Sequence, residues 1–109
     1  MKLVIAVIQD KDSGKLLEML VDEGFKATKL ASTGGFLKAG NTTVLIGVED
    51  HQVDDVVGII KQTCKSREKM VTTMSPLGGS VESYVPYPVE VIVGGATIFV
   101  VDVEKFERV

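Results

Sequence analysis

The distribution of apolar residues predicts a chain in which strands and helices alternate. Residues 2–9 form a continuous run of mainly β-branched side chains, which is typical of a strand buried on both faces. Four leucine and valine residues then recur at helical spacing and predict a helix over residues 13–23, with capping candidates in residues 10–13. A weaker strand is expected over residues 25–31 and a stronger one over residues 42–48.

The second half of the chain repeats part of this order. Asp50 is placed to cap a second helix, whose apolar residues recur at i, i+3, i+4, i+7 and i+11 (Val53, Val56, Val57, Ile60 and Cys64). Residues 66–88 contain three prolines and no periodicity, so we expect one long loop there. Residues 89–93 and 96–103 then flank Gly94-Gly95, a pair that signals a two-residue hairpin turn.

Two strand–helix–strand units with right-handed crossovers predict a ferredoxin-like α+β fold, with the element order βαββαβ. Both helices then cover one face of an antiparallel four-stranded sheet, and the other face is bare. Leaving apolar surface in water costs about 25 cal/mol per Å². We therefore expect that face to be covered, either by another copy of the chain or by the loop at residues 66–88 folding back over it.

Length and composition narrow the class of protein. A chain of 109 residues has room for one domain, residues 1–109. The net charge of -3 argues against a general nucleic-acid binder, for which basic surfaces are usual. Cys64 is the only cysteine, which excludes a disulfide within the chain and favours a reducing, cytoplasmic setting. Charges interrupt every apolar run before the ~20 residues that a membrane helix needs, so we expect no membrane insertion.

Residues suited to catalysis or metal binding are sparse. His51 is the only histidine and has no nucleophile beside it in the pattern, and Cys64 belongs to an apolar helix face. Asp50, Asp54 and Asp55 are expected to complement a helix dipole and not to hold a metal. The acidic turn at residues 9–14 contains no arginine, which disfavours a small phosphate-handling enzyme such as an acyl phosphate hydrolase. We expect no catalytic residue and no metal.

One segment has the chemistry of a nucleotide site. No acidic residue lies between Glu23 and Glu49, whereas three lysines do. Glycine pairs and lysines can hold phosphate, an asparagine amide can pair with a purine, and exposed apolar side chains can stack on a base. These features are combined in the segment (Lys26, Lys29, Gly34, Gly35, Phe36, Leu37, Lys38, Gly40 and Asn41). An ordinary lysine-bearing surface loop is the alternative.

Several motifs resemble the PII-like cyclic di-AMP receptors, the PstA or DarA family. They are Thr28-Lys-Leu-Ala-Ser-Thr-Gly-Gly-Phe-Leu-Lys-Ala-Gly-Asn-Thr-Thr43, Ser75-Pro-Leu-Gly-Gly, Tyr84-Val-Pro-Tyr-Pro-Val-Glu-Val and Val93-Gly-Gly-Ala-Thr-Ile-Phe99. The resemblance implies a bacterial homotrimer that signals and does not catalyse, with one cyclic di-AMP in each cleft between neighbouring subunits and no further cofactor. It implies a nucleotide-binding loop at residues 32–41 and nine ligand-binding residues (Lys26, Thr28, Gly35, Phe36, Leu37, Asn41, Gly47, Phe99 and Arg108).

The resemblance also carries expectations about selectivity and mechanism. The amide of Asn41 and backbone groups near Gly47 are expected to meet the edge of adenine. The loops at residues 32–40 and 71–87 are expected to become more ordered with ligand, which a downstream protein partner could detect. An ATP-binding PII-type sensor is the runner-up, although no tyrosine between Gly24 and Val48 matches the uridylylated loop tyrosine of the nitrogen-regulatory PII proteins.

Overall fold

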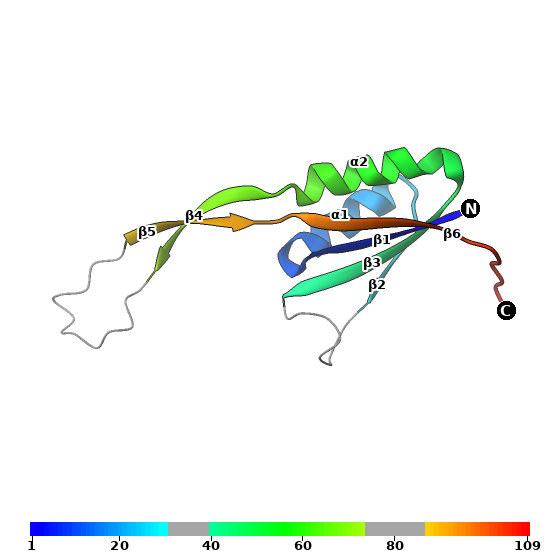
Figure 1. Ribbon diagram of the computed structural model, residues 1–109, viewed down its shortest axis with the longest axis horizontal. Helices are drawn as coiled ribbons and strands as arrows, with labels where there is room; N and C mark the ends of the chain where they lie inside the picture. Colours follow the sequence, from blue (N-terminus) through cyan, green and yellow to red (C-terminus); the bar gives the residue numbers. More distant parts are fainter. Residues whose placement is uncertain (31–39, 74–86) are drawn as a thin grey trace.

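The computed structural model describes residues 1–30, 40–73 and 87–109, and it contains a four-stranded antiparallel sheet with two helices (Figure 1). The strand order is β2-β3-β1-β6, which is the order of a ferredoxin-like fold and confirms the predicted α+β class. The elements of this body are β1 (Lys2–Gln9), α1 (Asp10–Asp22), β2 (Ala27–Leu30), β3 (Asn41–Val48), η1 (Asp50–Gln52), α2 (Val53–Cys64) and β6 (Ala96–Asp102).

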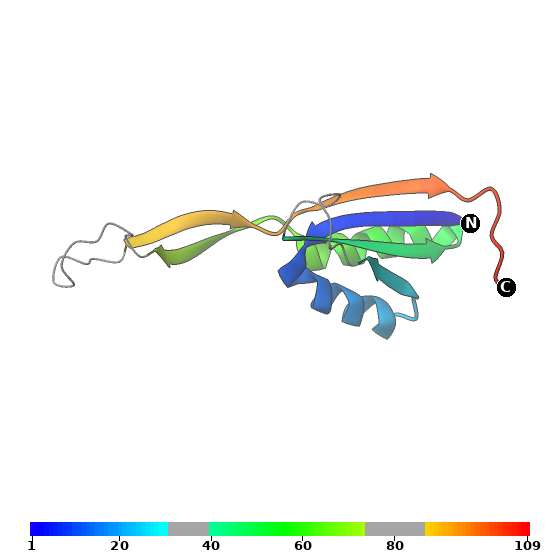
Figure 2. The ribbon, with the colours of Figure 1, turned by 90° about the horizontal axis from the view of Figure 1, so that it is seen from below.

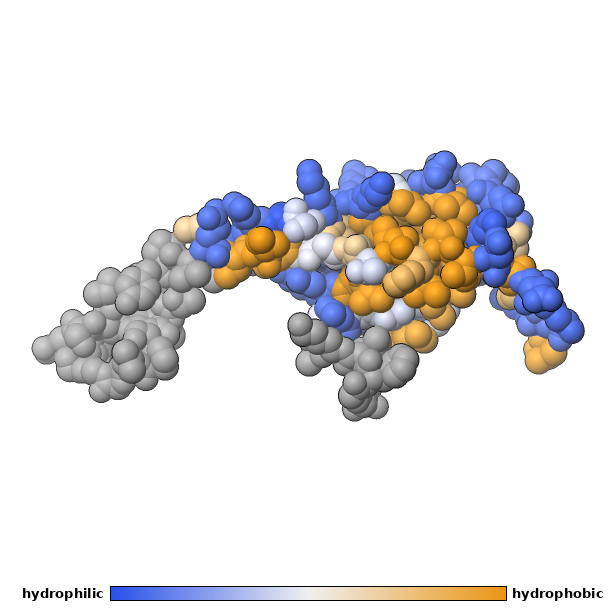
Figure 3. Space-filling view, viewed as in Figure 1, coloured by the Kyte–Doolittle hydropathy of each residue, from blue (hydrophilic) through white to orange (hydrophobic). Residues whose placement is uncertain are grey.

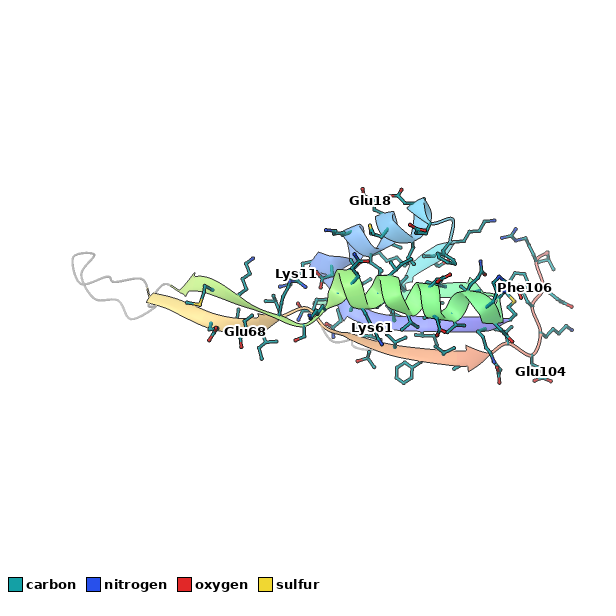
Figure 4. The ribbon with its side chains drawn as sticks, turned by 90° about the horizontal axis from the view of Figure 1, so that it is seen from above. Lys11, Glu18, Lys61, Glu68, Glu104 and Phe106 are labelled. Atoms are coloured by element: carbon teal, nitrogen blue, oxygen red, sulfur yellow. The ribbon has the colours of Figure 1, made fainter. Side chains whose placement is uncertain are left out.

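The core lies between the helices and one face of the sheet. Alternate residues of β1 and β3 point toward the helices and are at most 3% exposed, and they pack with one apolar side of each helix. The residues of this core are Val4, Ala6, Ile8, Leu16, Leu20, Val44, Ile46, Val48, Val56, Ile60 and Cys64. Charged side chains such as Glu18 and Lys61 lie on the exposed surface of the helices (Figure 4). The predicted burial of Cys64 is confirmed.

Both helices begin differently from the prediction. Helix α1 starts at Asp10 and not at residue 13, because the Asp10 N–H already donates to the Gly40 carbonyl (2.8 Å) and the Ser13 hydroxyl donates back to the Asp10 carbonyl (2.7 Å). Asp50 does not cap α2. Glu49 and Gln52 instead form a capping box around the short turn η1 that precedes α2, in which the Glu49 N–H donates to the Gln52 side chain (2.9 Å).

The prediction of one loop over residues 66–88 is wrong at both ends. Strands β4 (Arg67–Thr73) and β5 (Tyr87–Val93) pair as an antiparallel hairpin in a sheet of their own. These paired strands extend from one end of the body along the long axis of the molecule and do not fold back over the sheet (Figures 1 and 2). Glu68 lies on this hairpin, well away from both helices (Figure 4).

Gly94 and Gly95 do not form the predicted hairpin turn. β5 pairs with β4 and β6 pairs with β1, so the two glycines join strands of two different sheets. Both have positive φ values of 84° and 94°, which glycine adopts readily. Close packing requires glycine at residue 94, because a Cβ there would lie 2.6 Å from the Lys65 carbonyl oxygen. The glycine pair is therefore the junction at which the hairpin leaves the body.

The sheet face opposite the helices is apolar. Directly paired residues of antiparallel strands share a face, so Leu3, Ile5 and Val7 of β1 lie on this open face with Phe99 and Val101 of β6. Phe99 is 53% exposed and Val101 is 41% exposed. A broad apolar surface is visible over the sheet in Figure 3. Strands β4 and β5 do not cover this face (Figures 1 and 2).

Candidate functional site

The predicted site residues that the structure describes lie on and around the open face. Thr28 pairs with Leu45, Leu45 with Ile5, and Ile5 with Phe99, so one row of side chains crosses the sheet from β2 to β6. Gly47 lies in the next row, opposite Leu3. The polar, glycine and aromatic residues that were predicted to hold a nucleotide therefore share a surface with the apolar patch.

The structure brings three of these residues together at one edge. Thr28 is in the edge strand β2, Gly47 is in the neighbouring strand β3, and Lys26 directly precedes β2. All three are exposed. A Cβ at Gly47 would lie no closer than 3.4 Å to another heavy atom, which is an ordinary contact, so glycine there leaves the backbone open to a ligand without being required by packing. This edge combines a cation, a hydroxyl and accessible backbone.

Phe99 lies at the opposite edge of the same face. β2 and β6 are the two outer strands, and three strand spacings of about 4.8 Å put Thr28 and Phe99 about 14 Å apart. Arg108 is exposed in the C-terminal segment, which follows β6 and turns across the end of the sheet, past the level of β1 and β3 (Figure 2). Phe106 of the same segment is 62% exposed and is labelled in Figure 4. Phe99 therefore belongs to the β6 edge, whereas the segment that contains Arg108 starts at β6 and crosses beyond the end of the sheet.

Asn41 lies at the opposite end of β3 from Gly47. Six residue steps of about 3.3 Å separate them by about 20 Å, which is far longer than a purine. One purine therefore cannot contact both Asn41 and the backbone near Gly47 of the same chain, and their expected contacts with adenine stay a prediction. Asn41 instead pairs with Gln9, the last residue of β1.

Three of the predicted ligand-binding residues, Gly35, Phe36 and Leu37, lie outside the described residues. Of the predicted loop at residues 32–41, the structure describes Gly40 and Asn41. Gly40 has a φ of 91°, which favours glycine, and its carbonyl accepts the Asp10 N–H. The hydroxyl of Thr42 donates to the carboxylate of Asp10. The end of the predicted loop is thus fixed to the first turn of α1.

Two polar contacts at the base of the hairpin were not predicted. The Asp12 side chain is 7% exposed and accepts a hydrogen bond from Arg67 at 2.8 Å, and this bond raises the pKa of Arg67. The Gln9 side chain accepts the Gly94 N–H at 2.8 Å. Neither contact has a local sequence signal, because Asp12 and Arg67 are 55 residues apart and Gln9 and Gly94 are 85 residues apart.

The described residues also form a cavity that is lined by other side chains. A cavity of about 450 Å³ on the helix side of the sheet is lined by Ile60, Cys64 and Ala96 among others and contains no predicted site residue. Burial raises the pKa of the Cys64 thiol to about 11, which keeps it protonated at neutral pH. Within residues 1–30, 40–73 and 87–109, no three side chains of the metal-ligating types gather, and no helix is long and apolar enough to cross a membrane.

The strand order, the helix arrangement and the open apolar face define a ferredoxin-like α+β protein. The chain matches the cyclic-di-AMP receptor family over residues 1–109 and belongs to it. It is also similar to a protein of unknown function from Pediococcus pentosaceus, whose crystal structure is known. The two sequences are 44% identical, and the two structures superpose with a TM-score of 0.76. That match covers 99% of this chain and 96% of the other. The resemblance seen in the sequence is confirmed, as is the prediction of a non-enzymatic binding protein.

Proposed function

We propose that this chain is a cytoplasmic signalling receptor that binds cyclic di-AMP in clefts between the subunits of a homotrimer. Membership of the cyclic-di-AMP receptor family is the observation that carries the choice of ligand. The nine residues expected to bind it are Lys26, Thr28, Gly35, Phe36, Leu37, Asn41, Gly47, Phe99 and Arg108.

The spacing of these residues supports a cleft between two chains. Lys26, Thr28 and Gly47 gather at the β2 edge of the sheet, whereas Phe99 lies in β6 at the opposite edge. A separation of about 14 Å across one sheet is too long for both groups to contact the same purine. Packing the β6 side of one copy beside the β2 edge of its neighbour would bring the two groups together.

The open face supports association of the chain with itself. Its exposed apolar side chains include Phe99, Val101 and Leu30, which is 42% exposed. Contiguous exposed apolar surface in a protein usually marks an interaction site. A second copy offers the same β6 and β2 edges, so a closed ring of copies would cover all of these residues while leaving one cleft at each boundary.

Titration calorimetry tests the ligand, and sedimentation equilibrium tests the assembly. We expect cyclic di-AMP to bind with one molecule per subunit, and cyclic di-GMP to bind much more weakly because guanine presents different donors and acceptors. We expect a trimer at micromolar concentration. Binding of ATP without binding of cyclic di-AMP would favour the PII-type sensor instead, and a monomer would contradict the two-chain cleft.

The proposed signal is a change in the loops at residues 32–40 and 71–87 when ligand binds. A ligand shifts a conformational equilibrium only through contacts that differ between its states. Hydrogen exchange with and without cyclic di-AMP should show protection in both loops. Unchanged exchange in both would make the protein a buffer of the nucleotide and would remove the route to a protein partner.

A further inference from the structure

The predicted binding residue Asn41 and the β4–β5 hairpin meet at the same few residues of the β1–α1 junction. From these contacts we infer that Gln9 and Asp12 are positioning residues that couple ligand binding to the hairpin. The inference rests on the proposed function, because it takes Asn41 as a ligand contact.

Gln9 forms the direct connection. It is the cross-strand partner of Asn41 at the last pair of the β1–β3 ladder, where side chains on one face are about 4.5 to 5.5 Å apart. Its side-chain oxygen accepts the N–H of Gly94, the first residue of the junction between β5 and β6. One side chain therefore lies beside a predicted ligand contact and holds the base of the hairpin.

The first turn of α1 forms a second connection. The Asp10 N–H donates to the Gly40 carbonyl and the Thr42 hydroxyl donates to the Asp10 carboxylate, so this turn is bonded to the residues on both sides of Asn41. Two residues further on, Asp12 accepts a hydrogen bond from Arg67, the first residue of β4. The helix turn joins the two contacts rigidly, since its own backbone is hydrogen-bonded.

Arg67 and the glycine junction also fix the hairpin to the end of α2. Arg67 donates to the Lys65 carbonyl (3.0 Å), and the Gly95 N–H donates to the Cys64 carbonyl. A shift of β3 at Asn41 therefore cannot be absorbed by a free hinge at the hairpin base. It must be transmitted through Gln9 and Asp12, or it must break one of their hydrogen bonds.

The two connections can be tested separately by substitution. Gln9→Leu removes the acceptor for the Gly94 N–H at similar volume, whereas Gln9→Glu retains a side-chain oxygen that can accept it. Asp12→Asn removes the charge that pairs with Arg67. Asp102→Asn is the matched control, because it breaks an ion pair with Lys2 at the far end of β1.

The experiment compares hydrogen exchange of residues 68–70 and 90–92 with and without saturating cyclic di-AMP in the parent and the four variants. Calorimetry on each protein first confirms that ligand binds, and circular dichroism confirms folding. In the parent and in Asp102→Asn, ligand should slow exchange of these amides. Gln9→Leu, which loses one hydrogen bond, should reduce that ligand-induced slowing by about fivefold or more, and Gln9→Glu should restore it. Asp12→Asn, which keeps an acceptor oxygen but loses the charge that pairs with Arg67, should also reduce the slowing.

The outcomes separate the inference from the proposed function. If the parent does not bind cyclic di-AMP in calorimetry, the proposed function fails. If ligand binds but leaves hairpin exchange unchanged, the coupling is wrong and the receptor function stands. The role of the Gln9 acceptor would be overturned if Gln9→Leu showed the same ligand-induced slowing of exchange as the parent. It would also be overturned if Gln9→Glu lost that slowing as well. Should Gln9→Leu fail to fold, Asp12→Asn decides, and a normal response in that variant would overturn the coupling through Asp12.

Discussion

Gly94→Ala should destabilise the protein much more than Gly95→Ala, although the two glycines are adjacent and have similar φ values of 84° and 94°. Placing alanine in this left-handed region costs about 1 to 2 kcal/mol at either position. At Gly94 the new Cβ would also lie 2.6 Å from the Lys65 carbonyl oxygen and 3.3 Å from that of Cys64. At Gly95 the nearest heavy atom is the Cβ of Ser66 at 3.9 Å, an ordinary contact.

The difference between the two variants can be worked out from these contacts. Forcing an extra carbon into a packed site costs about 1 to 3 kcal/mol. The backbone shift that relieves it would break the 2.8 Å hydrogen bond from Gly94 to Gln9, which is worth about 1 kcal/mol. Gly94→Ala should therefore lose about 2 to 4 kcal/mol more free energy of unfolding than Gly95→Ala.

Urea unfolding followed by circular dichroism measures this difference, with all proteins at one concentration so that association contributes equally. Gly24→Ala is a second control, because Gly24 has a φ of 85° and no heavy atom within 4 Å of the added Cβ. We expect Gly24→Ala and Gly95→Ala to give similar losses. Equal losses for Gly94→Ala and Gly95→Ala would refute the reasoning, and they would be the result expected if the pair were a simple two-residue turn.

Three further predictions concern the assembly, the thiol and the ligand. Val101→Asp should raise the protein concentration at the monomer–trimer midpoint at least tenfold in sedimentation equilibrium, because burying an unpaired carboxylate at the open face costs several kcal/mol. An unchanged midpoint would place Val101 outside the interface. With its pKa raised from 9.0 to about 11, the Cys64 thiol should be about a hundredfold less ionised at pH 8 than a free cysteine, and its reaction with an aromatic disulfide reagent should be slow until urea unfolds the chain. The same shift should lower stability as pH rises from 9 to 11, because only the unfolded thiol then loses its proton. Lys26→Ala should weaken cyclic di-AMP binding about tenfold or more and flatten its salt dependence, whereas Asn41→Ala should weaken binding with the salt dependence retained; equal salt slopes in both variants would argue against a phosphate contact at Lys26.

The central sheet and the two helices were predictable because the apolar pattern of each element reflects which of its faces is buried. β1 is apolar on both faces, since one face meets the helices and the other is the open face, and its predicted bounds match the structure. The spacing of Val56, Ile60 and Cys64 likewise follows from one buried helix side. Local pattern and tertiary contact agree for these segments.

The hairpin was not predictable from the same pattern. The described side chains of β4 and β5 join no core cluster, and Met70 and Ile92 remain 59% and 72% exposed. Residues 67–73 therefore show no alternation of apolar and polar residues, and residues 89–93 read as a strand whose partner was expected in residues 96–103 and not in β4. The prolines near β5 favoured a loop, although Pro88 sits in a two-stranded ribbon where each strand is an edge and tolerates a residue that has no N–H to donate.

The types of residue in the candidate site were predictable from the sequence, but their positions across the sheet were not. Antiparallel pairing of the second and third strands is enough to place Thr28 and Gly47 on neighbouring strands. The separation of Asn41 from Gly47, and of Thr28 from Phe99, depends on strand register and strand order, which no local motif encodes. Asp12 and Arg67 meet only because the hairpin leaves the body beside α1, and their contact depends on the whole topology.

The narrow attachment of the β4–β5 ribbon has a mechanical consequence. Seven residues per strand give a paired length of about 23 Å from the glycine junction, and the hydrogen bonds that join the described ribbon to the body lie at its base. It therefore acts as a lever. A tilt of about 10° at the junction, which displaces atoms near Gly94 by well under 1 Å, would move the far end of the paired strands by about 4 Å, a displacement large enough to make or break contact with a neighbouring molecule.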